Sequence, residues 1–452
     1  MTIINNISNM FIMIIILIIL LMMLFITGGN QLLLIPPDPD EFRDIHQLIR
    51  SRGYHLHEYN VLTEDQYILT IHRVVPKISL SGSRIFYDDP ISSYNKQRKP
   101  VVIFHGVLTD TAVWYFNSPP LSKQSSIPPT SAYYHSLLND TQHCEDNFGF
   151  CMLKTGRYDL WVANARGNRY SRKHIRYSPE KDREFWRYSL DQIALYDIPA
   201  IVDLIRTITG HRTLGWIGYS QGAGSMFALL SIRPEFGQII RPFICWAPGI
   251  YFNNAKTLVG PLLVASIPYL VSNPGEYRLS SSPVNVFLQY PACHHRPGNL
   301  ICSIIYQAIF GPTNHLNITR IPTYFHYIPS SISNWQVAHF TQIAISGRFR
   351  RFDYLNVHQN IAAYGQSEPP DYPLYRIPKH IPIVIMYGAT DWFIDPEDIH
   401  LLIYTLRNYG LRNVISYPIQ SEYWNHVDYI TGQGAGQLVY DPTVKYLDLY
   451  AW

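Results

Sequence analysis

From about residue 40 the chain alternates between short apolar runs rich in β-formers and longer segments with apolar residues at helical spacing. This alternation is typical of a mostly parallel sheet with crossover helices. The predicted strands are Tyr67–Val75, Pro100–Phe104, Tyr158–Ala163, Leu214–Gly218 and Ile381–Met386, and the predicted helices are Asp40–Ser51, Trp186–Ile208 and Ser225–Ile232. The pattern therefore predicts an α/β fold.

The alternation breaks down between Tyr251 and about Tyr375, where apolar helical pieces are separated by proline-punctuated loops. One piece, Leu258–Val271, is almost entirely apolar. We interpret residues 251–375 as a mainly helical cap inserted into a core domain made of 30–250 and 376–452. The Ser- and Pro-rich segment 115–155 is predicted to be a second, loop-like insertion.

The first 29 residues differ from the rest of the chain. Phe11–Ile26 has no charged residue, and Thr27-Gly28-Gly29 offers small residues for signal peptidase, so we expect a secretory signal peptide. Because the run is about as long as the shortest membrane spans, an uncleaved anchor stays open as the alternative. Either segment would deliver the chain to the secretory lumen, secreted or lysosomal, where the sequons at Asn139 and Asn317 could be glycosylated.

Composition narrows the possible partners. A chain of 452 residues with 47% hydrophobic side chains can bury a large core. Its formal charge is only +3 and its basic residues are scattered, with RFRRF at 348–352 the densest cluster. Phosphate binding needs a concentrated basic face, so we expect no nucleic-acid partner. The sequence gives no indication of the oligomeric state.

The five cysteines fit an oxidising compartment. Cys144 and Cys151 flank a short loop, as do Cys293 and Cys302, which favours two local disulfides. Cys245 is left over in the apolar stretch PFICWAP, where no basic neighbour could lower its pKa, so it is predicted to be a buried thiol. Paired CxxC spacing is absent from the sequence, and no metal site is expected.

The strongest chemical motif is G-Y-S-Q-G, with Ser220 between Gly218 and Gly222. It matches the nucleophile elbow, a turn from strand to helix so tight that side chains at the flanking positions would collide. The turn presents the serine hydroxyl at the N-terminus of a helix, whose N–H groups can stabilise an oxyanion. Its position between a predicted buried strand and a predicted helix makes Ser220 the candidate nucleophile.

A serine nucleophile needs a base, and in hydrolases with this elbow the acid of the triad precedes the base in the chain. Asp391 directly follows the strand at 381–387, whereas Asp395 and Asp398 fall at the cap and first turn of the next predicted helix, where a carboxylate has a structural role. His426 lies downstream of the acid, as the order requires, whereas His400 falls within that helix. We therefore predict Asp391 as the acid and His426 as the base.

The second oxyanion donor is expected in the loop after the strand that ends at Phe104. The backbone N–H groups of Val107 and Gln221 are the natural pair. The glycine run at 432–436 lacks the strand-to-helix setting of a dinucleotide loop, and no Walker lysine follows any glycine run. We accordingly expect no cofactor.

These residues resemble the acid lipases, the family of gastric and lysosomal acid lipases. The resemblance extends over about residues 38–450 and rests on HGVLTDTAVW, GRYDLWVANARGNRYSRKHIRYSP, FWRYSLDQIALYDIPA, GYSQG, GATDWFIDPED and WNHVDYI. It implies the α/β-hydrolase fold with a cap, and hydrolysis of triacylglycerols or sterol esters at a lipid–water interface. It also implies a triad of Ser220, Asp391 and His426, oxyanion donors at Val107 and Gln221, and a cap disulfide between Cys293 and Cys302.

The chain departs from the family pattern at several positions. The family usually has His in place of Tyr219 and Leu in place of Val107. It also commonly has a third cap cysteine, which would fall near Phe310 and is absent from this chain. Two other functions remain compatible with the residues: an acyltransferase that uses the same triad, and a non-catalytic lipid-binding protein on the same fold. The intact Ser, Asp and His favour a catalyst.

Overall fold

The computed structural model describes residues 33–34, 37–76, 98–117, 144, 147–277, 293–296 and 298–451. The predicted signal segment, Asn139 and most of the insertion at 115–155 lie outside these residues.

A nine-stranded sheet forms the centre of the described chain, in the order β11-β10-β8-β7-β4-β5-β3-β2, with β6 paired to β3. Neighbours from β5 to β11 are parallel, whereas β3 is antiparallel to both β2 and β5. The strands are β2 (Tyr54–Leu62), β3 (Tyr67–Pro76), β4 (Lys99–Phe104), β5 (Tyr158–Ala163), β6 (Lys173–His174), β7 (Leu214–Tyr219), β8 (Ile240–Trp246), β10 (Ile383–Tyr387) and β11 (Val414–Pro418).

All five predicted strands are confirmed, with ends that differ by at most two residues. Every residue of β4, β5 and β7 is buried, which is why these strands are continuous apolar runs in the sequence. Sequence analysis missed β2, β8 and β11. The edge strands β2 and β11 have few buried positions, and Arg241 and Pro242 interrupt the apolar run near the start of β8.

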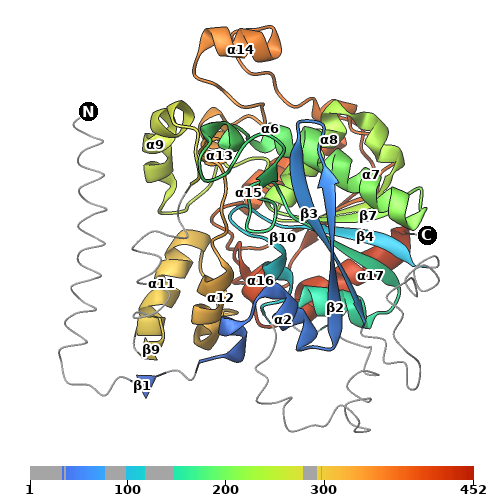
Figure 1. Ribbon diagram of the computed structural model, residues 1–452, viewed down its shortest axis with the longest axis vertical. Coiled ribbons are helices and arrows are strands. Elements are labelled where there is room, and N and C mark those ends of the chain that lie inside the picture. Colours follow the sequence, from blue (N-terminus) through green and yellow to red (C-terminus); the bar gives the residue numbers. More distant parts are fainter. Residues whose placement is uncertain are drawn as a thin grey trace, which may run out of the picture.

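Helices cover both faces of the sheet (Figure 1): α7 (Ile198–Thr209) and α8 (Gln221–Ile232) lie on one face, and α17 (Asp441–Tyr450) lies on the other. The predicted helix 186–208 is confirmed from Leu190 onward, where α6 (Leu190–Gln192), a π-helical turn (Ile193–Asp197) and α7 follow one another without a break. The predicted helix 40–51, in contrast, is divided. Asp38 and Asp44 each cap a separate helix, so Pro39–Phe42 and α2 (Ile45–Arg50) are independent pieces.

Residues 251–375 add no strand to the main sheet among their described residues. They contain α9 (Gly260–Ser272), α11 (Gly298–Phe310), α12 (Ile321–Tyr327), α13 (Asn334–Ser346) and α14 (Val357–Tyr364), and α14 projects from the body of the molecule (Figure 1). A short strand, β9 (His295–Arg296), pairs antiparallel with β1 (Leu33–Leu34). The described residues of this interval are therefore mainly helical and lie outside the main sheet.

The cap has an apolar cluster of its own, in which Ile267, Leu270 and Val271 of α9 pack with Val337 and Ala338 of α13. The half-buried side chains of the loop after β4 pack against the same cluster. In addition, the backbone N–H of Ser330 donates to the carbonyl of Leu108 at 2.6 Å. The cap thus rests directly on the loop in which an oxyanion donor was predicted.

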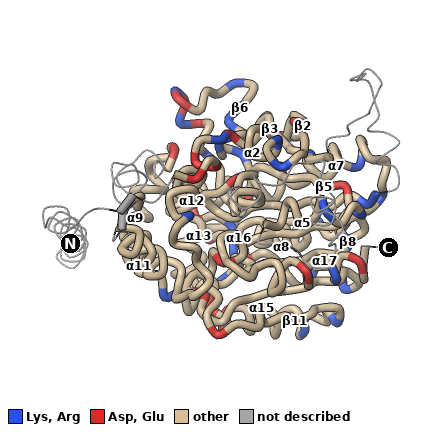
Figure 2. The backbone as a smooth tube through the Cα atoms, turned by 90° about the horizontal axis from the view of Figure 1, so that it is seen from below, with Lys and Arg blue, Asp and Glu red and all other residues tan. Residues whose placement is uncertain are grey.

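Charges are spread over the surface, with basic and acidic positions interspersed (Figure 2). Helices α9 and α11 carry no Lys, Arg, Asp or Glu. In the described part of the chain, no helix has both the length and the apolar character needed to cross a membrane.

Candidate active site

Ser220 occupies the turn between β7 and α8, in a backbone conformation with φ of 52° that few non-glycine residues adopt. Hydrogen bonds on both sides hold this turn. The Ser220 N–H donates to the carbonyl of Trp246 at 2.8 Å, and the Ser220 carbonyl accepts from the N–H groups of Gly224 at 3.0 Å and Gly249 at 3.1 Å. The strained serine is therefore fixed by the two central strands and by the start of α8.

The glycines that flank Ser220 are sterically required. A Cβ atom on Gly222 would lie 2.2 Å from the carbonyl oxygen of Phe104, and one on Gly218 would lie 2.5 Å from the backbone nitrogen of Ala223. Both contacts are with backbone atoms that side-chain motion cannot relieve. The helix can approach the sheet this closely only because both positions are glycine.

His426 and Asp391 meet Ser220 from loops that follow other elements. His426 Nε2 lies 3.1 Å from Ser220 Oγ, and His426 Nδ1 lies 2.8 Å from Asp391 Oδ2. The other carboxylate oxygen of Asp391 accepts the backbone N–H groups of Phe393 at 2.9 Å and Ile394 at 2.7 Å. All three side chains are largely buried, with 6%, 5% and 1% exposure for Ser220, His426 and Asp391. The three residues selected from the sequence thus form one hydrogen-bonded chain.

The competing carboxylates lie away from the histidine and have other partners. Asp395 caps α15 (Pro396–Asn408) by accepting the N–H of Glu397 at 3.0 Å, and it pairs with Lys256. Asp398 accepts from the backbone N–H groups of Asn253 and Asn254, where the chain enters the cap. His400 lies within α15, as expected. Asp395 and Asp398 therefore have structural roles.

The predicted oxyanion donors lie at the two places expected from the motif. Gln221 is the first residue of α8, and Val107 is in the loop after β4. Neither backbone N–H donates to an acceptor among the described residues. Both groups are therefore free to bind an oxygen of a reacting ester.

His105 holds the oxyanion loop in place. Its Nε2 accepts the backbone N–H of Ala165 at 3.1 Å, so the proton must be on Nδ1, which donates to the carbonyl of Gly106 at 2.7 Å. Complete burial lowers the pKa of His105 and keeps the ring neutral. Through this neutral tautomer, His105 connects the oxyanion loop to the polar segment that follows β5.

A cap residue also reaches the elbow. The side-chain amide of Gln336, on α13, donates to the side-chain oxygen of Gln221, the residue that follows the nucleophile. Gln336 is 1% exposed, so this contact is shielded from solvent. Sequence reasoning missed Gln336 because nothing in its local pattern distinguishes it from other polar helix residues.

The cysteines are arranged as the spacing indicated. Cys144 is bonded to Cys151 and Cys293 to Cys302, while Cys245 is a buried free thiol whose pKa burial raises. Asn317 is half-buried at the start of a short 3-10 turn. In the described ranges, no group of three or more His, Cys, Asp or Glu side chains is arranged to hold a metal ion.

The chain is similar to known lipases over most of its length. Residues 45–118 match the family model of a partial α/β-hydrolase lipase region, and residues 99–236 match that of the α/β-hydrolase fold. The chain is 30% identical to gastric triacylglycerol lipase of Homo sapiens over 417 residues, covering 91% of this chain and 92% of that protein. The chain belongs to the acid lipase family. As an acid lipase it is a carboxylic ester hydrolase with the α/β-hydrolase fold.

Other acid lipases show the same degree of similarity. Lipase member K of Homo sapiens is 29% identical over 419 residues, covering 91% of this chain and 92% of that protein. A protein of Crotalus adamanteus, named after lysosomal acid lipase/cholesteryl ester hydrolase, is 29% identical over 413 residues and matches 90% of this chain and 91% of its own. Among solved structures, an esterase from Exiguobacterium antarcticum covers 87% of this chain and 100% of its own at 10% identity and a TM-score of 0.45.

Proposed function

We propose that this acid lipase hydrolyses neutral lipid esters, triacylglycerols or sterol esters, through an acyl-enzyme on Ser220. The observation that carries the proposal is the chain of hydrogen bonds from Asp391 through His426 to Ser220. The substrate class is supported by the relatives, which are named as a triacylglycerol lipase and after a cholesteryl ester hydrolase. The uncharged helices α9 and α11 also suit a lipid–water interface.

In the first half of the reaction, His426 Nε2 accepts the proton of Ser220 Oγ as that oxygen bonds to the ester carbonyl carbon. The negative charge that develops on the carbonyl oxygen is stabilised by the N–H groups of Val107 and Gln221. His426 then donates its proton to the alcohol oxygen as the ester bond breaks. The alcohol leaves, and the acyl group remains on Ser220.

In the second half, His426 takes a proton from water, whose oxygen attacks the acyl carbon, and then returns a proton to Ser220 Oγ as the fatty acid leaves. Asp391 accepts a hydrogen bond from Nδ1–H throughout and so stabilises the positively charged imidazole that forms in each half. If an alcohol replaced water, the same groups would transfer the acyl chain. The printed names of the relatives favour water as the acceptor.

The test is Ser220→Ala on the purified protein, measured with a soluble short-chain ester and with emulsified triacylglycerol and cholesteryl ester. Ser231→Ala is the matched control, because Ser231 lies on the same helix, is also buried and bonds only to the carbonyl of Ala228. We expect a loss of at least about 10⁴-fold for Ser220→Ala and little change for the control. A fluorophosphonate should label Ser220 alone. Activity within tenfold of wild type in Ser220→Ala would refute the proposal.

We further propose that the protein enters the secretory pathway and is secreted or delivered to lysosomes. Support comes from the apolar segment Phe11–Ile26, from the two disulfides and from relatives named for the stomach and the lysosome. N-terminal sequencing of the purified protein would distinguish cleavage near residue 29 from an uncleaved anchor. A mass shift on deglycosylation would test Asn139 and Asn317.

A further inference from the structure

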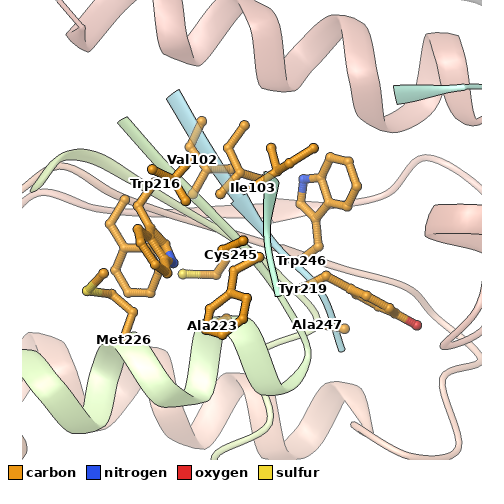
Figure 3. Close-up of a cluster of buried hydrophobic side chains, with 14 of the residues drawn as sticks. Val102, Ile103, Trp216, Tyr219, Ala223, Met226, Cys245, Trp246 and Ala247 are labelled. Atoms are coloured by element: carbon orange, nitrogen blue, oxygen red, sulfur yellow. The ribbon is translucent and has the colours of Figure 1, made fainter. Parts of the chain in front are cut away.

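Tyr219, the residue before the nucleophile, forms a direct link to the base. Its phenolic hydroxyl donates to the backbone carbonyl of His426 at 2.7 Å. Both residues are largely buried, and their rings lie 5.4 Å apart. Figure 3 shows the Tyr219 side chain extending away from Trp216 and Met226, with its hydroxyl at the far end. The hydroxyl is therefore directed at the loop that carries His426 rather than into the hydrophobic cluster.

The loop that carries His426 is also held at points outside β7: Asn425 Nδ2 donates to the carbonyl of Gly311 at 2.7 Å, and the Thr390 N–H donates to the carbonyl of Trp424 at 3.2 Å. The backbone N–H of His426 reaches the carbonyl of Phe310 only at 3.5 Å. Asn425 shapes the turn itself, since its side-chain oxygen accepts the N–H groups of Val427 and Asp428. The short bond from Tyr219 connects this turn to β7, the strand that carries Ser220.

We propose that Tyr219 is a positioning residue, whose hydroxyl holds His426 within reach of Ser220 Oγ. This inference rests on the function proposed above. Because residues 219 and 220 are adjacent, the end of one strand sets the place of both nucleophile and base. Burial raises the pKa of the Tyr219 phenol well above its usual value, so the hydroxyl is protonated and can donate at acidic and neutral pH.

The rival explanation is that any buried phenol must find an acceptor and that the nearest carbonyl happens to belong to His426. The chain provides a matched control for it. Tyr440 is equally buried and donates to the backbone carbonyl of Tyr429 at 2.8 Å, in the segment that follows the same loop. Tyr219→Phe and Tyr440→Phe therefore remove the same chemical group from the same kind of bond.

The experiment compares kcat and KM of both variants on a soluble short-chain ester, together with the rate of fluorophosphonate labelling of Ser220. Each rate is expressed per active site, titrated by complete labelling, so that misfolded molecules do not count. We expect Tyr219→Phe to lower kcat and the labelling rate by about tenfold with KM unchanged, because a displaced base is a poorer proton acceptor. Tyr440→Phe should leave all three values within twofold of wild type.

The results separate this inference from the proposed function. Labelled and active wild-type enzyme establishes the catalytic serine, whatever Tyr219 does. If Tyr219→Phe stays within twofold of wild type, or if both variants lose the same factor in kcat, Tyr219 has no specific positioning role. If Tyr219→Phe lowers kcat/KM only by raising KM, the inference is overturned as well, because the effect would then lie in substrate binding.

Discussion

Asp391 and Asp395 lie four residues apart, yet their surroundings give them different tasks. Asp391 is bonded to His426, whereas Asp395 caps a helix. We predict that Asp391→Asn lowers kcat by about 10⁴-fold, because the amide no longer holds His426 in the productive tautomer. Asp395→Asn should cost less than tenfold in kcat. Steady-state kinetics on a soluble ester, with circular dichroism to check folding, would decide, and a larger loss in Asp395→Asn would show that the acid is misassigned.

At this scale the sequence was informative where chemistry requires a motif or an order of residues. The glycines around Ser220 and the position of Asp391 after a strand could be recognised without coordinates. Tyr219 and Gln336 could not. Their partners are 207 and 115 residues away in the chain, and only the folded structure shows that residues so far apart are in contact.

At the scale of elements, α9 is neither buried on all sides nor an ordinary surface helix. Ile267, Leu270 and Val271 are buried against α13, while other apolar side chains of the same helix are exposed: Leu262 at 42%, Val264 at 44% and Tyr269 at 66%. So apolar a segment could also have formed a helix buried on all sides, and these exposures exclude that arrangement. The exposed apolar face fits an element that covers the site in water and contacts lipid at an interface.

We predict that replacing Leu262, Val264 and Tyr269 with Ser lowers the hydrolysis of emulsified long-chain triacylglycerol by at least about tenfold, because the lipid-facing surface is lost. A soluble short-chain ester should be hydrolysed within twofold of the wild-type rate, since no residue of the triad changes. The matched control places Ser at Leu355, Val357 and Ile361, which are equally exposed around α14.

Two outcomes would contradict this prediction. An equal fall on both substrates would mean that α9 supports the fold or the site rather than the interface. An equal loss on emulsion in the α14 control would mean that apolar surface in general, rather than α9 in particular, brings the enzyme to lipid.

The elements that sequence analysis found and those it missed differ in burial. Central strands are continuous apolar runs because helices cover both of their faces. The edge strand β2 alternates half-buried and exposed positions, and its mixed composition resembles a loop. The division of helix 40–51 depended on Asp44, whose carboxylate accepts the N–H of Gln47 and starts a new helix. Such a cap can be recognised in sequence, but it was outweighed by the apolar periodicity.

At the scale of the whole molecule, the sequence predicted the bounds of the cap, but it did not predict the contacts that attach the cap to the core. Asp191, buried on α6 of the core, accepts the phenolic hydroxyl of Tyr372 and lies 3.4 Å from Arg351 Nε. On the other side, the cap residue Arg320 pairs with Asp38 and Asp40 near the start of the described chain. These buried charges join segments that are far apart in sequence, and hydropathy contains no information on such pairings.

One buried acid should make the stability of the whole molecule depend on pH. Asp428, two residues after His426, is completely buried. Burial and the charge of Asp391 raise its pKa to about 7, against hydrogen bonds from Asn425 and Thr313 that lower it. The folded protein therefore holds this proton more tightly than the unfolded chain does, whose Asp has the ordinary pKa of 3.8. By linkage, the contribution of Asp428 to the free energy of unfolding falls as pH rises from about 4 to about 7.

The neutral isostere tests this linkage, because Asp428→Asn keeps an oxygen to accept the N–H of Asn425 and has no charge to desolvate. The free energy of unfolding of Asp428→Asn minus that of wild type should rise by about 2 kcal/mol from pH 5 to pH 7. Urea unfolding at both pH values measures the difference, so contributions from all other groups cancel. Asp203→Asn is the control, since Asp203 is exposed on α7 and should show no such gain.

A constant difference between Asp428→Asn and wild type at the two pH values would mean that Asp428 ionises normally in the fold. A gain of the expected size would mean that the enzyme is built to keep this carboxyl protonated beside its triad and loses stability as the medium approaches neutrality.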